Sequence, residues 1–301
     1  MFYDKTGSYS LVPSLKKAID NMISRLLAAV EPLELRQAMM HGAFGGKRVR
    51  PIVTMLSCSA AGGDAFDASQ AATAIELLHT SSLVHDDIMD GADMRRGVPT
   101  IHSRYGLSMG ILAGDTMIAL AFELMQNCGT LNRERMMTKF MRAFRHTCEG
   151  QGYDLVLSPP RNGTAASHRL MVEKKTARLL EAAASIGAMV ATSNDEHIRA
   201  LGQFGFDLGM AFQAKDDLLD QMGDEAMLGK PVHADQRNGK MTYASLAAGK
   251  ESEQGMAALA SIEDHVVDLT RSACSALDVL PASPARENLK ALAEALLARE
   301  T

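Results

Sequence analysis

The sequence has very few aromatic residues, and this scarcity limits the folds it can adopt. Trp is absent and aromatic residues make up only 5% of 301 positions, whereas Ala, Leu and Met dominate the apolar set. Because those three residues favour helices over strands, the composition predicts an all-α protein. Gly and Pro are too scarce for a fibrous or disordered chain.

Several other absences exclude whole classes of protein. The four cysteines form no CxxC pair and no metal-ligand spacing, so we interpret them as reduced thiols of a cytoplasmic protein. A net charge of -5 argues against nucleic acid as a partner. The N-terminal segment lacks the pattern of a signal peptide. Since no run of about 18 apolar residues is present, we expect no transmembrane helix.

Helical periodicity runs through most of the chain. The segment 15–30 places apolar residues on one stripe, and 68–90 is apolar almost all round, which is typical of an interior helix. No linker or repeat is visible, so we expect a single all-helical domain over 1–301. Further helices are predicted near 107–127, 132–150, 165–192, 195–222, 241–247, 252–279 and 285–299.

Two clusters of aspartates stand on these apolar helices, 130 positions apart. "DDIMD" contains Asp86, Asp87 and Asp90, and "DDLLD" contains Asp216, Asp217 and Asp220. The first and last aspartate of each cluster share a helix face, because residues four apart are neighbours on a helix. Like charges at that spacing destabilise a helix, and the cost rises near a core unless cations neutralise them.

The aspartates offer only oxygen ligands, which hard divalent cations prefer. Mg²⁺ is usually bound through one or two carboxylates and completes its shell with water and phosphate. The two clusters therefore predict several Mg²⁺ ions bridged by a polyphosphate. The alternative is an acidic helix end or an ion-pair network, which explains one cluster more easily than two.

Basic residues that suit a polyphosphate accompany these clusters. Arg forms forked contacts with phosphate, whereas Lys acts as a mobile point charge. His79 lies two turns before Asp86, where it either contacts phosphate or is simply packed, and Gln213 lies three residues before Asp216. The remaining candidates are Lys47, Arg48 and Arg50 in "GGKRVRP", then Arg95, Arg96, Lys175, Thr176, Lys230 and Lys240.

Six ordered motifs give the chain a family resemblance over roughly residues 41–247. They are "GGKRVRP", "ELLHTSSLVHDDIMDGADMRRG", "GQGYDL", "KKTARLL", "FQAKDDLLD" and "LGKP" followed by "GKMTY". In this order they resemble the trans-isoprenyl diphosphate synthases, or polyprenyl synthetases. The resemblance implies a large all-α bundle around a deep central cavity, usually a homodimer. It also implies the elongation of an allylic diphosphate by isopentenyl diphosphate.

The resemblance assigns a role to each matched residue. Asp86, Asp90 and Asp216 would hold three Mg²⁺ with the allylic diphosphate. Asp87, Asp217 and Asp220 would support these metal ligands. Asp220 is also counted among the metal-binding residues. The isopentenyl diphosphate site would comprise Lys47, Arg50, His79 and Arg96. Arg95, Lys175, Thr176, Gln213, Lys230 and Lys240 would surround the allylic diphosphate, with Lys175, Thr176 and Gln213 also stabilising the allylic cation.

Small residues before the first cluster predict the product length. Ser82 lies one helical turn before Asp86 with Ser81 beside it, whereas family members that stop at C15 often carry a bulky aromatic residue there. The upper pocket is therefore open. Leu78, one turn deeper, and Met117 of the neighbouring helix are expected near the floor. We predict a C20 product, with farnesyl or longer chains as alternatives.

Three other functions fit parts of the pattern. A terpene cyclase shares the fold but usually has a different second metal motif. A metal-dependent phosphohydrolase leaves the second aspartate cluster unexplained. A non-catalytic subunit of a hetero-oligomeric synthase tends to lose the aspartates, and here both clusters are intact.

Overall fold

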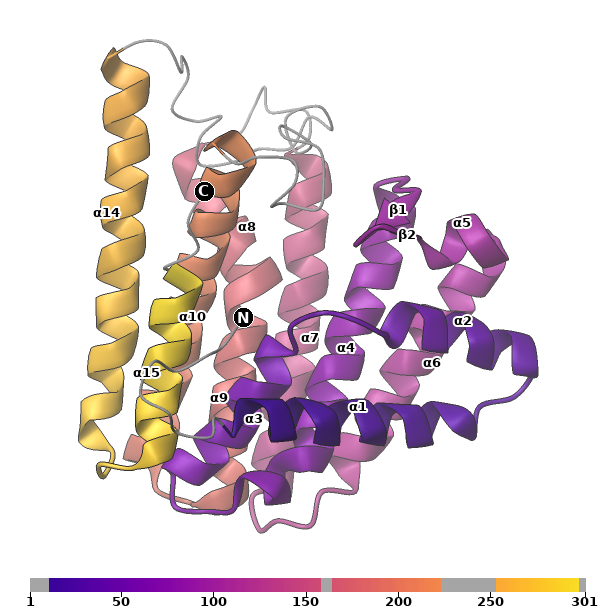
Figure 1. Cartoon of the computed structure of the whole chain (residues 1–301), viewed down its shortest axis with the longest axis horizontal. Coiled ribbons are helices and arrows are strands. Elements are labelled where there is room, and N and C mark those ends of the chain that lie inside the picture. The colour runs from indigo at the N-terminus through magenta and orange to yellow at the C-terminus, as the bar shows by residue number, and fades with distance from the viewer. Residues whose placement is uncertain (1–10, 158–163, 223–252, 298–301) are drawn as a thin grey trace.

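The computed structural model describes residues 11–157, 164–222 and 253–297, and these residues are mostly helical (Figure 1). The only strands in the described part are β1 (Met94–Arg95) and β2 (Val98–Pro99), an antiparallel pair. The helices are α1 (Val12–Ala28), α2 (Leu33–Ala43), α3 (Val49–Ala60), η1 (Ala65–Ala68), α4 (Ser69–Met89), α5 (Ile101–Tyr105), α6 (Leu107–Gln126), α7 (Arg133–Val156), α8 (Ala165–Val172), η3 (Glu173–Ala177), α9 (Arg178–Ala191), α10 (Asp195–Met222), α14 (Glu253–Ala276), η4 (Leu277–Val279) and α15 (Pro284–Leu297).

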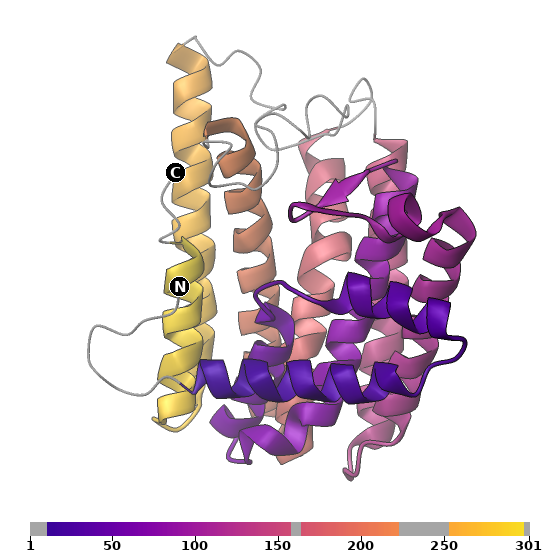
Figure 2. The same cartoon turned by 45° about the vertical axis from the view of Figure 1, so that its right-hand side comes forward.

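The helices form a bundle in which α4 and α9 are central. Helix α4 packs against α3 and α6, while α9 packs against α3 and α10, and α10 packs against α14. In both views α1 lies across the lower part of the upright helices (Figures 1 and 2). The all-α bundle predicted from the sequence is thus confirmed.

Burial follows the predicted apolar patterns. Helix α1 buries the stripe Leu15, Ile19, Ile23 and Leu27, and α4 is buried almost all round, as an interior helix should be. The predicted helix 165–192 is instead divided into α8, a π-helical segment η3 and α9. Thr164 is the N-cap of α8, and its side chain accepts a hydrogen bond from the Ser167 backbone. The helix predicted at 241–247 lies outside the described residues.

Helix α6 is more apolar than the sequence analysis anticipated when it predicted no transmembrane helix. Among the described residues it is the one helix long and apolar enough to cross a membrane, and 28% of its most apolar window is buried. A single helix of this kind is weak evidence of a membrane span, because core helices of other proteins have the same composition. Gly110, Ala113 and Met117 are on its buried face. Leu107 and Leu112 are more than half exposed.

Candidate active site

A cavity of about 590 Å³ joins the two aspartate clusters. Asp86 of α4 and Asp216 of α10 both line it, so helices distant in sequence bring one carboxylate from each cluster to the same space. Lys175 and Thr176 of η3 and Gln213 of α10 also line it. Asp90, which follows the last residue of α4, is half-buried and is not among the lining residues.

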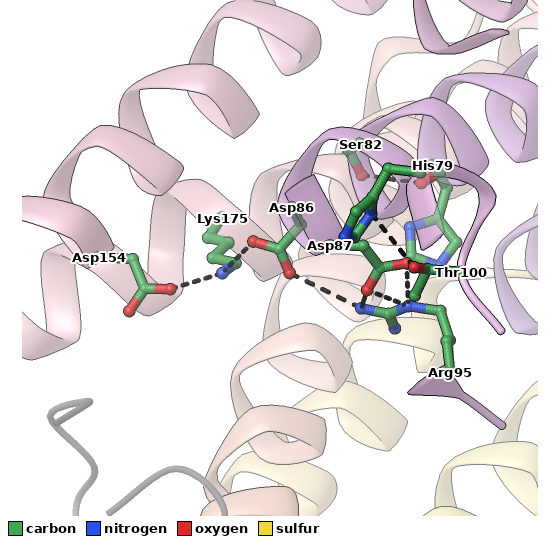
Figure 3. Close-up of polar contacts among 9 residues, drawn as sticks. His79, Ser82, Asp86, Asp87, Arg95, Thr100, Asp154 and Lys175 are labelled. Atoms are coloured by element: carbon green, nitrogen blue, oxygen red, sulfur yellow. Dashed lines mark hydrogen bonds and ion pairs between the residues drawn. The ribbon is translucent and has the colours of Figure 1, made fainter. Parts of the chain in front are cut away.

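Lys175 bridges two carboxylates at this cavity. Its Nζ donates to Asp154 Oδ2 at 2.6 Å and to Asp86 Oδ1 at 3.2 Å (Figure 3). Asp154 is buried in α7, within the "GQGYDL" motif. The motif alone predicts no role for Asp154, because a lone carboxylate near a helix end is usually on the surface. Its contact with Lys175 makes it part of the site.

The π-helical segment η3 places Lys175 and Thr176 beside α7. A Cβ built on Gly150 of α7 would lie 2.3 Å from the backbone nitrogen of Lys175, so the two backbones touch and only Gly fits. π-helical turns inside α-helices are rare and often occur at functional sites. Here the irregular turn positions two of the predicted catalytic side chains.

Asp87 and Arg95 form a tight pair. Arg95 Nε donates to the two Asp87 oxygens at 2.7 and 2.8 Å, and its Nη2 lies 3.9 Å from Asp86 Oδ2 (Figure 3). Burial raises the pKa of Asp87, and the Arg95 guanidinium opposes that shift. Asp87 therefore anchors strand β1 to α4, while Arg95 still lines the cavity.

The four residues predicted to bind isopentenyl diphosphate come together. Lys47, Arg50, His79 and Arg96 all line a second cavity of about 340 Å³. Arg50, His79 and Arg96 line the first cavity as well, so the two spaces adjoin. A cationic cavity thus lies directly beside the cavity that Asp86 and Asp216 share, which we call the acidic cavity after these two candidate metal ligands.

The one carboxylate among the residues lining the cationic cavity is Glu76, which pairs with Arg48 at 2.7 Å. Arg50 Nη1 lies 3.0 Å from His79 Nε2, and because a guanidinium only donates, His79 accepts there and is neutral. Burial lowers the pKa of His79 well below its usual value, and Arg50 and Arg96 lower it further. Burial also lowers the pKa of Arg50 to about 10. Arg50 Nε has no hydrogen-bond partner among the described residues.

Arg96 is held in an unusual backbone conformation. Its φ is 52°, in the left-handed region that non-glycine residues rarely adopt. A Cβ on Gly46 would lie 2.8 Å from Arg96 Nη1, so the guanidinium rests on this glycine. Burial lowers the pKa of Arg96, with a further contribution from Arg95. Backbone strain of this kind is typical of binding sites, where surrounding structure maintains it.

Arg48 does not act as the free phosphate donor that the sequence predicted. Its buried guanidinium donates to Asp20 of α1 at 2.9 Å, to Glu76 of α4 at 2.7 Å and to the Ala43 carbonyl at 2.6 Å. Its φ is 55°, in the left-handed region that non-glycine residues rarely adopt. Arg48 borders the same cavity as Lys47 and Arg50, but its guanidinium is engaged by Asp20, Glu76 and the Ala43 carbonyl and fixes the loop.

A polar chain connects η3 to α10. Thr176 Oγ1 donates to Gln213 Oε1 at 3.0 Å, and Gln213 Nε2 donates to Asp217 Oδ1 at 2.9 Å. His168 Nε2 lies 3.4 Å from Asp217 Oδ2, and both side chains are buried. No sequence spacing pointed to His168. The side chain of Asp220, and Lys230 and Lys240 entirely, lie outside the described residues.

The donor chemistry of the first cavity suits Mg²⁺ bound together with phosphate. Among the described residues, no three His, Cys, Asp or Glu side chains form a ready-made metal cluster. Asp86 and Asp216 nevertheless present carboxylate oxygens to one cavity from two helices. Mg²⁺ needs only one or two carboxylates when water and phosphate supply the other ligands.

A third and larger cavity, of about 860 Å³, opens between α2, α4 and α5. It borders Asp87 and Glu76, but Arg95 and Arg48 already neutralise these carboxylates. It borders neither Asp86 nor Asp216, so it does not join the two aspartate clusters.

The lower part of the first cavity differs from the predicted arrangement. Ser81 and Ser82 line it as expected. Leu78 and Met117 are instead packed in the core and are not among its lining residues. Ile118 of α6 and Phe144 of α7 line it in their place. The roles assigned to Leu78 and Met117 stay predictions, and the cavity adds Ile118 and Phe144 as candidates on α6 and α7.

Comparisons with known proteins agree with this geometry. The Polyprenyl synthetase family model matches residues 32–275. Geranylgeranyl diphosphate synthase of Sulfolobus acidocaldarius is 44% identical over 230 residues, covering 75% of this chain and 69% of that protein. Geranylfarnesyl diphosphate synthase of Aeropyrum pernix is 38% identical over 276 residues, covering 86% and 84%. Geranylgeranyl pyrophosphate synthetase of Pyrococcus horikoshii superposes with a TM-score of 0.89 at 36% identity, covering 96% and 97%.

The bundle and its cavity thus have the isoprenoid synthase type of fold. The chain belongs to the polyprenyl synthetase family, and it is a prenyltransferase of the isoprenyl diphosphate synthase class. The family resemblance drawn from the six motifs is confirmed.

Proposed function

We propose that this prenyltransferase condenses isopentenyl diphosphate with an allylic diphosphate in the presence of Mg²⁺. One observation carries the proposal: an acidic cavity and a cationic cavity adjoin and share Arg50, His79 and Arg96. A metal-bound diphosphate suits the first cavity, and a metal-free diphosphate suits the second. Because the two cavities adjoin, the carbon skeletons of the two substrates lie next to each other in the proposal.

The acidic cavity receives the allylic substrate. Asp86 and Asp216, which line this cavity, would hold Mg²⁺ together with Asp90 and Asp220, three ions in the proposal. The bound metal would neutralise charge on the leaving diphosphate. Lys175 lies 3.2 Å from Asp86, where its ammonium group neutralises part of the same diphosphate. Arg95 adds a second cation from the hairpin of β1 and β2. Lys230 and Lys240, which the family resemblance assigns to the same substrate, lie outside the described residues.

The cationic cavity receives isopentenyl diphosphate. Arg50 and Arg96 donate forked hydrogen bonds to its phosphates, and Lys47 adds a point charge. Since His79 is neutral and accepts from Arg50 through Nε2, its other ring nitrogen carries a proton. That N–H is a further donor. The negative charge of the bound isopentenyl diphosphate compensates the positive charge of these side chains.

The reaction follows from this placement. The allylic C–O bond breaks and releases diphosphate, and the isopentenyl double bond attacks the resulting carbon cation. The new cation then loses a proton to the released diphosphate, which completes a chain that is five carbons longer. Thr176 and Gln213, linked at 3.0 Å, present oxygen dipoles that stabilise the cation. Apolar walls exclude water that would otherwise capture it.

We propose geranylgeranyl diphosphate, C20, as the main product. The named relatives support a short to medium chain, since they include both geranylgeranyl and geranylfarnesyl synthases. The hydroxyls of Ser81 and Ser82 donate to the Leu78 and His79 carbonyls, at 2.7 and 2.8 Å. Their polar atoms are therefore satisfied, and small side chains face a prenyl tail.

Ser82→Phe should shorten the product. A ring one turn below Asp86 fills the space that the second isoprene unit occupies, because a helical turn rises about 5.4 Å, roughly one unit. Reverse-phase chromatography of dephosphorylated products should show C15 or shorter chains. Ser82→Ala is the matched control and should keep the parent length; an unchanged length in Ser82→Phe would mean that the tail does not pass this residue.

We also propose a homodimer that works in the cytoplasm. Leu107, Ile111 and Leu112 form an exposed apolar face on α6, a feature that marks interfaces between subunits. A second copy of the chain covers this face in the proposal. The cytoplasmic assignment rests on the four cysteines, which are free thiols in the structure.

An elongation assay tests the proposed function. Purified protein is incubated with Mg²⁺, labelled isopentenyl diphosphate and each allylic starter in turn, from C5 to C20. Elongation that EDTA abolishes and that needs isopentenyl diphosphate is expected. A terpene cyclase would consume the allylic diphosphate alone, and a non-catalytic subunit would elongate no starter.

A further inference from the structure

We infer that Phe144 of α7 ends the space available to the prenyl tail and so determines the length of the product. The inference rests on the proposed function. Phe144 and Ile118 border the cavity from α7 and α6, whereas Ser81 and Ser82 border it from α4. Among these side chains Phe144 carries the largest apolar group, and the sequence analysis did not consider it.

An aromatic cluster holds Phe144 in place. Its ring meets Phe122 of α6 edge to face, with centroids 5.9 Å apart and planes at 73°. Phe122 in turn meets Phe140 at 5.1 Å and 72°, and Phe140 is fully buried. Edge-to-face pairs of this kind are favourable beyond their burial. Phe144 therefore cannot swing aside without breaking contacts that reach the core, which makes it a firm wall.

The depth of Phe144 matches a three-unit tail. Asp154, on the same helix, holds Lys175 at the level of Asp86, where the diphosphate binds in the proposal. Phe144 lies ten positions earlier on α7, about 15 Å along the helix axis at about 1.5 Å per residue. At roughly one isoprene unit per turn of about 5.4 Å, that distance admits nearly three units.

This depth explains why elongation would stop at C20. A C15 starter, with three units, fits above Phe144 and is elongated once. The C20 product has four units and no longer fits as a starter, so it is released. Leu78, which is packed in the core, does not limit the tail. Phe144 then decides whether the prenyl diphosphate is elongated once more or released as product.

Substitution of Phe144 tests the inference directly. Phe144→Ala removes the wall, and products longer than C20 should appear. The rate with a C20 starter relative to a C15 starter should rise by about ten-fold or more, since small steric changes in apolar pockets discriminate on this scale. Phe144→Trp should shift products below C20. Phe66→Ala, an exposed phenylalanine on η1, is the matched control and should keep the parent distribution.

The outcomes separate the inference from the proposed function. If the parent protein elongates no starter, the proposed function fails and the inference falls with it. If the parent elongates while both Phe144 variants keep its product lengths and starter preference, only the inference is overturned. Circular dichroism checks each variant, and Phe144→Leu, a milder change with the same expected direction, replaces Phe144→Ala if that protein does not fold.

Discussion

His79 is a neutral histidine among arginines, and its protonation couples pH to stability. The unfolded chain protonates it near pH 6.5, whereas in the folded protein burial and Arg50 keep the pKa well below that value. Below about pH 6.5 the unfolded state therefore binds more protons. The free energy of unfolding should fall there, by at most about 1.4 kcal/mol per pH unit from this residue.

Urea unfolding of the parent and of His79→Gln between pH 7.5 and 5 measures how much His79 contributes to the pH dependence of the free energy of unfolding. Gln retains an acceptor for Arg50 but does not titrate, so the variant should lose less stability as the pH falls. Equal slopes for the two proteins would show that His79 does not carry this coupling.

Asp154 orients Lys175 from a buried position, and its removal should affect catalysis more than folding. Asp154→Asn keeps the shape but loses the charge that holds the ammonium group at 2.6 Å. We expect kcat for elongation to fall by about 10–100-fold, the usual effect of removing a supporting partner. The KM for isopentenyl diphosphate should stay near the parent value. Asp264→Asn, on the exposed face of α14, is the control.

Single residues show which parts of the site were readable from the sequence. Charged groups within ordered motifs, such as Asp86 and Arg50, were predicted and do border the cavities. The structural role of Arg48 was missed because its partners, Asp20 and Glu76, are each 28 positions away in sequence and no spacing rule connects them. Phe144 was missed because a lone aromatic on an amphipathic helix is usually just part of the core.

Among the elements, η3 determines the position of two catalytic candidates through its contact with α7. Gly150→Ala would force a methyl group against the Lys175 backbone, 2.3 Å from its nitrogen. The π-helical turn must then move, so we expect elongation to fall sharply and stability to drop. Steady-state kinetics and thermal unfolding measure the two effects.

Gly152 is a matched control for that substitution on the same helix. A Cβ there meets nothing within 4 Å. Gly152→Ala should therefore raise the free energy of unfolding by up to about 1 kcal/mol, the usual helix preference of Ala over Gly. If Gly150→Ala behaved in the same stabilising way, the close contact with η3 would not constrain the site.

The sequence predicted the regular helices well and the irregular ones poorly. Periodicity over 68–90 matches α4, Ser69–Met89, almost residue for residue. The π-helical turn within 165–192 was not predicted, because one extra residue in a turn barely disturbs an apolar period near 3.6. Helix α7 extends to Val156, beyond the predicted end at 150, because its last turns keep packing against η3. The single-domain organisation stays a prediction.

At the scale of the whole molecule, the apolar face of α6 predicts self-association. Ile111→Asp places a charge at the centre of that face and should convert a dimer into monomers in sedimentation velocity experiments. Leu131→Asp changes a fully exposed residue before α7 and should leave the mass unchanged. A parent protein that sediments as a monomer at micromolar concentration would contradict the proposed homodimer.

The spatial separation of the carboxylates from the serines and Phe144 has an evolutionary consequence. The groups that break and form bonds lie at one level of the cavity, and the side chains that meet the end of the tail lie turns away on α4 and α7. In the proposed function, mutations at the lower level are expected to change which compound is made without changing how it is made. Relatives within this one family are named for geranylgeranyl and for geranylfarnesyl products, and we expect such differences to arise at a few positions of this kind.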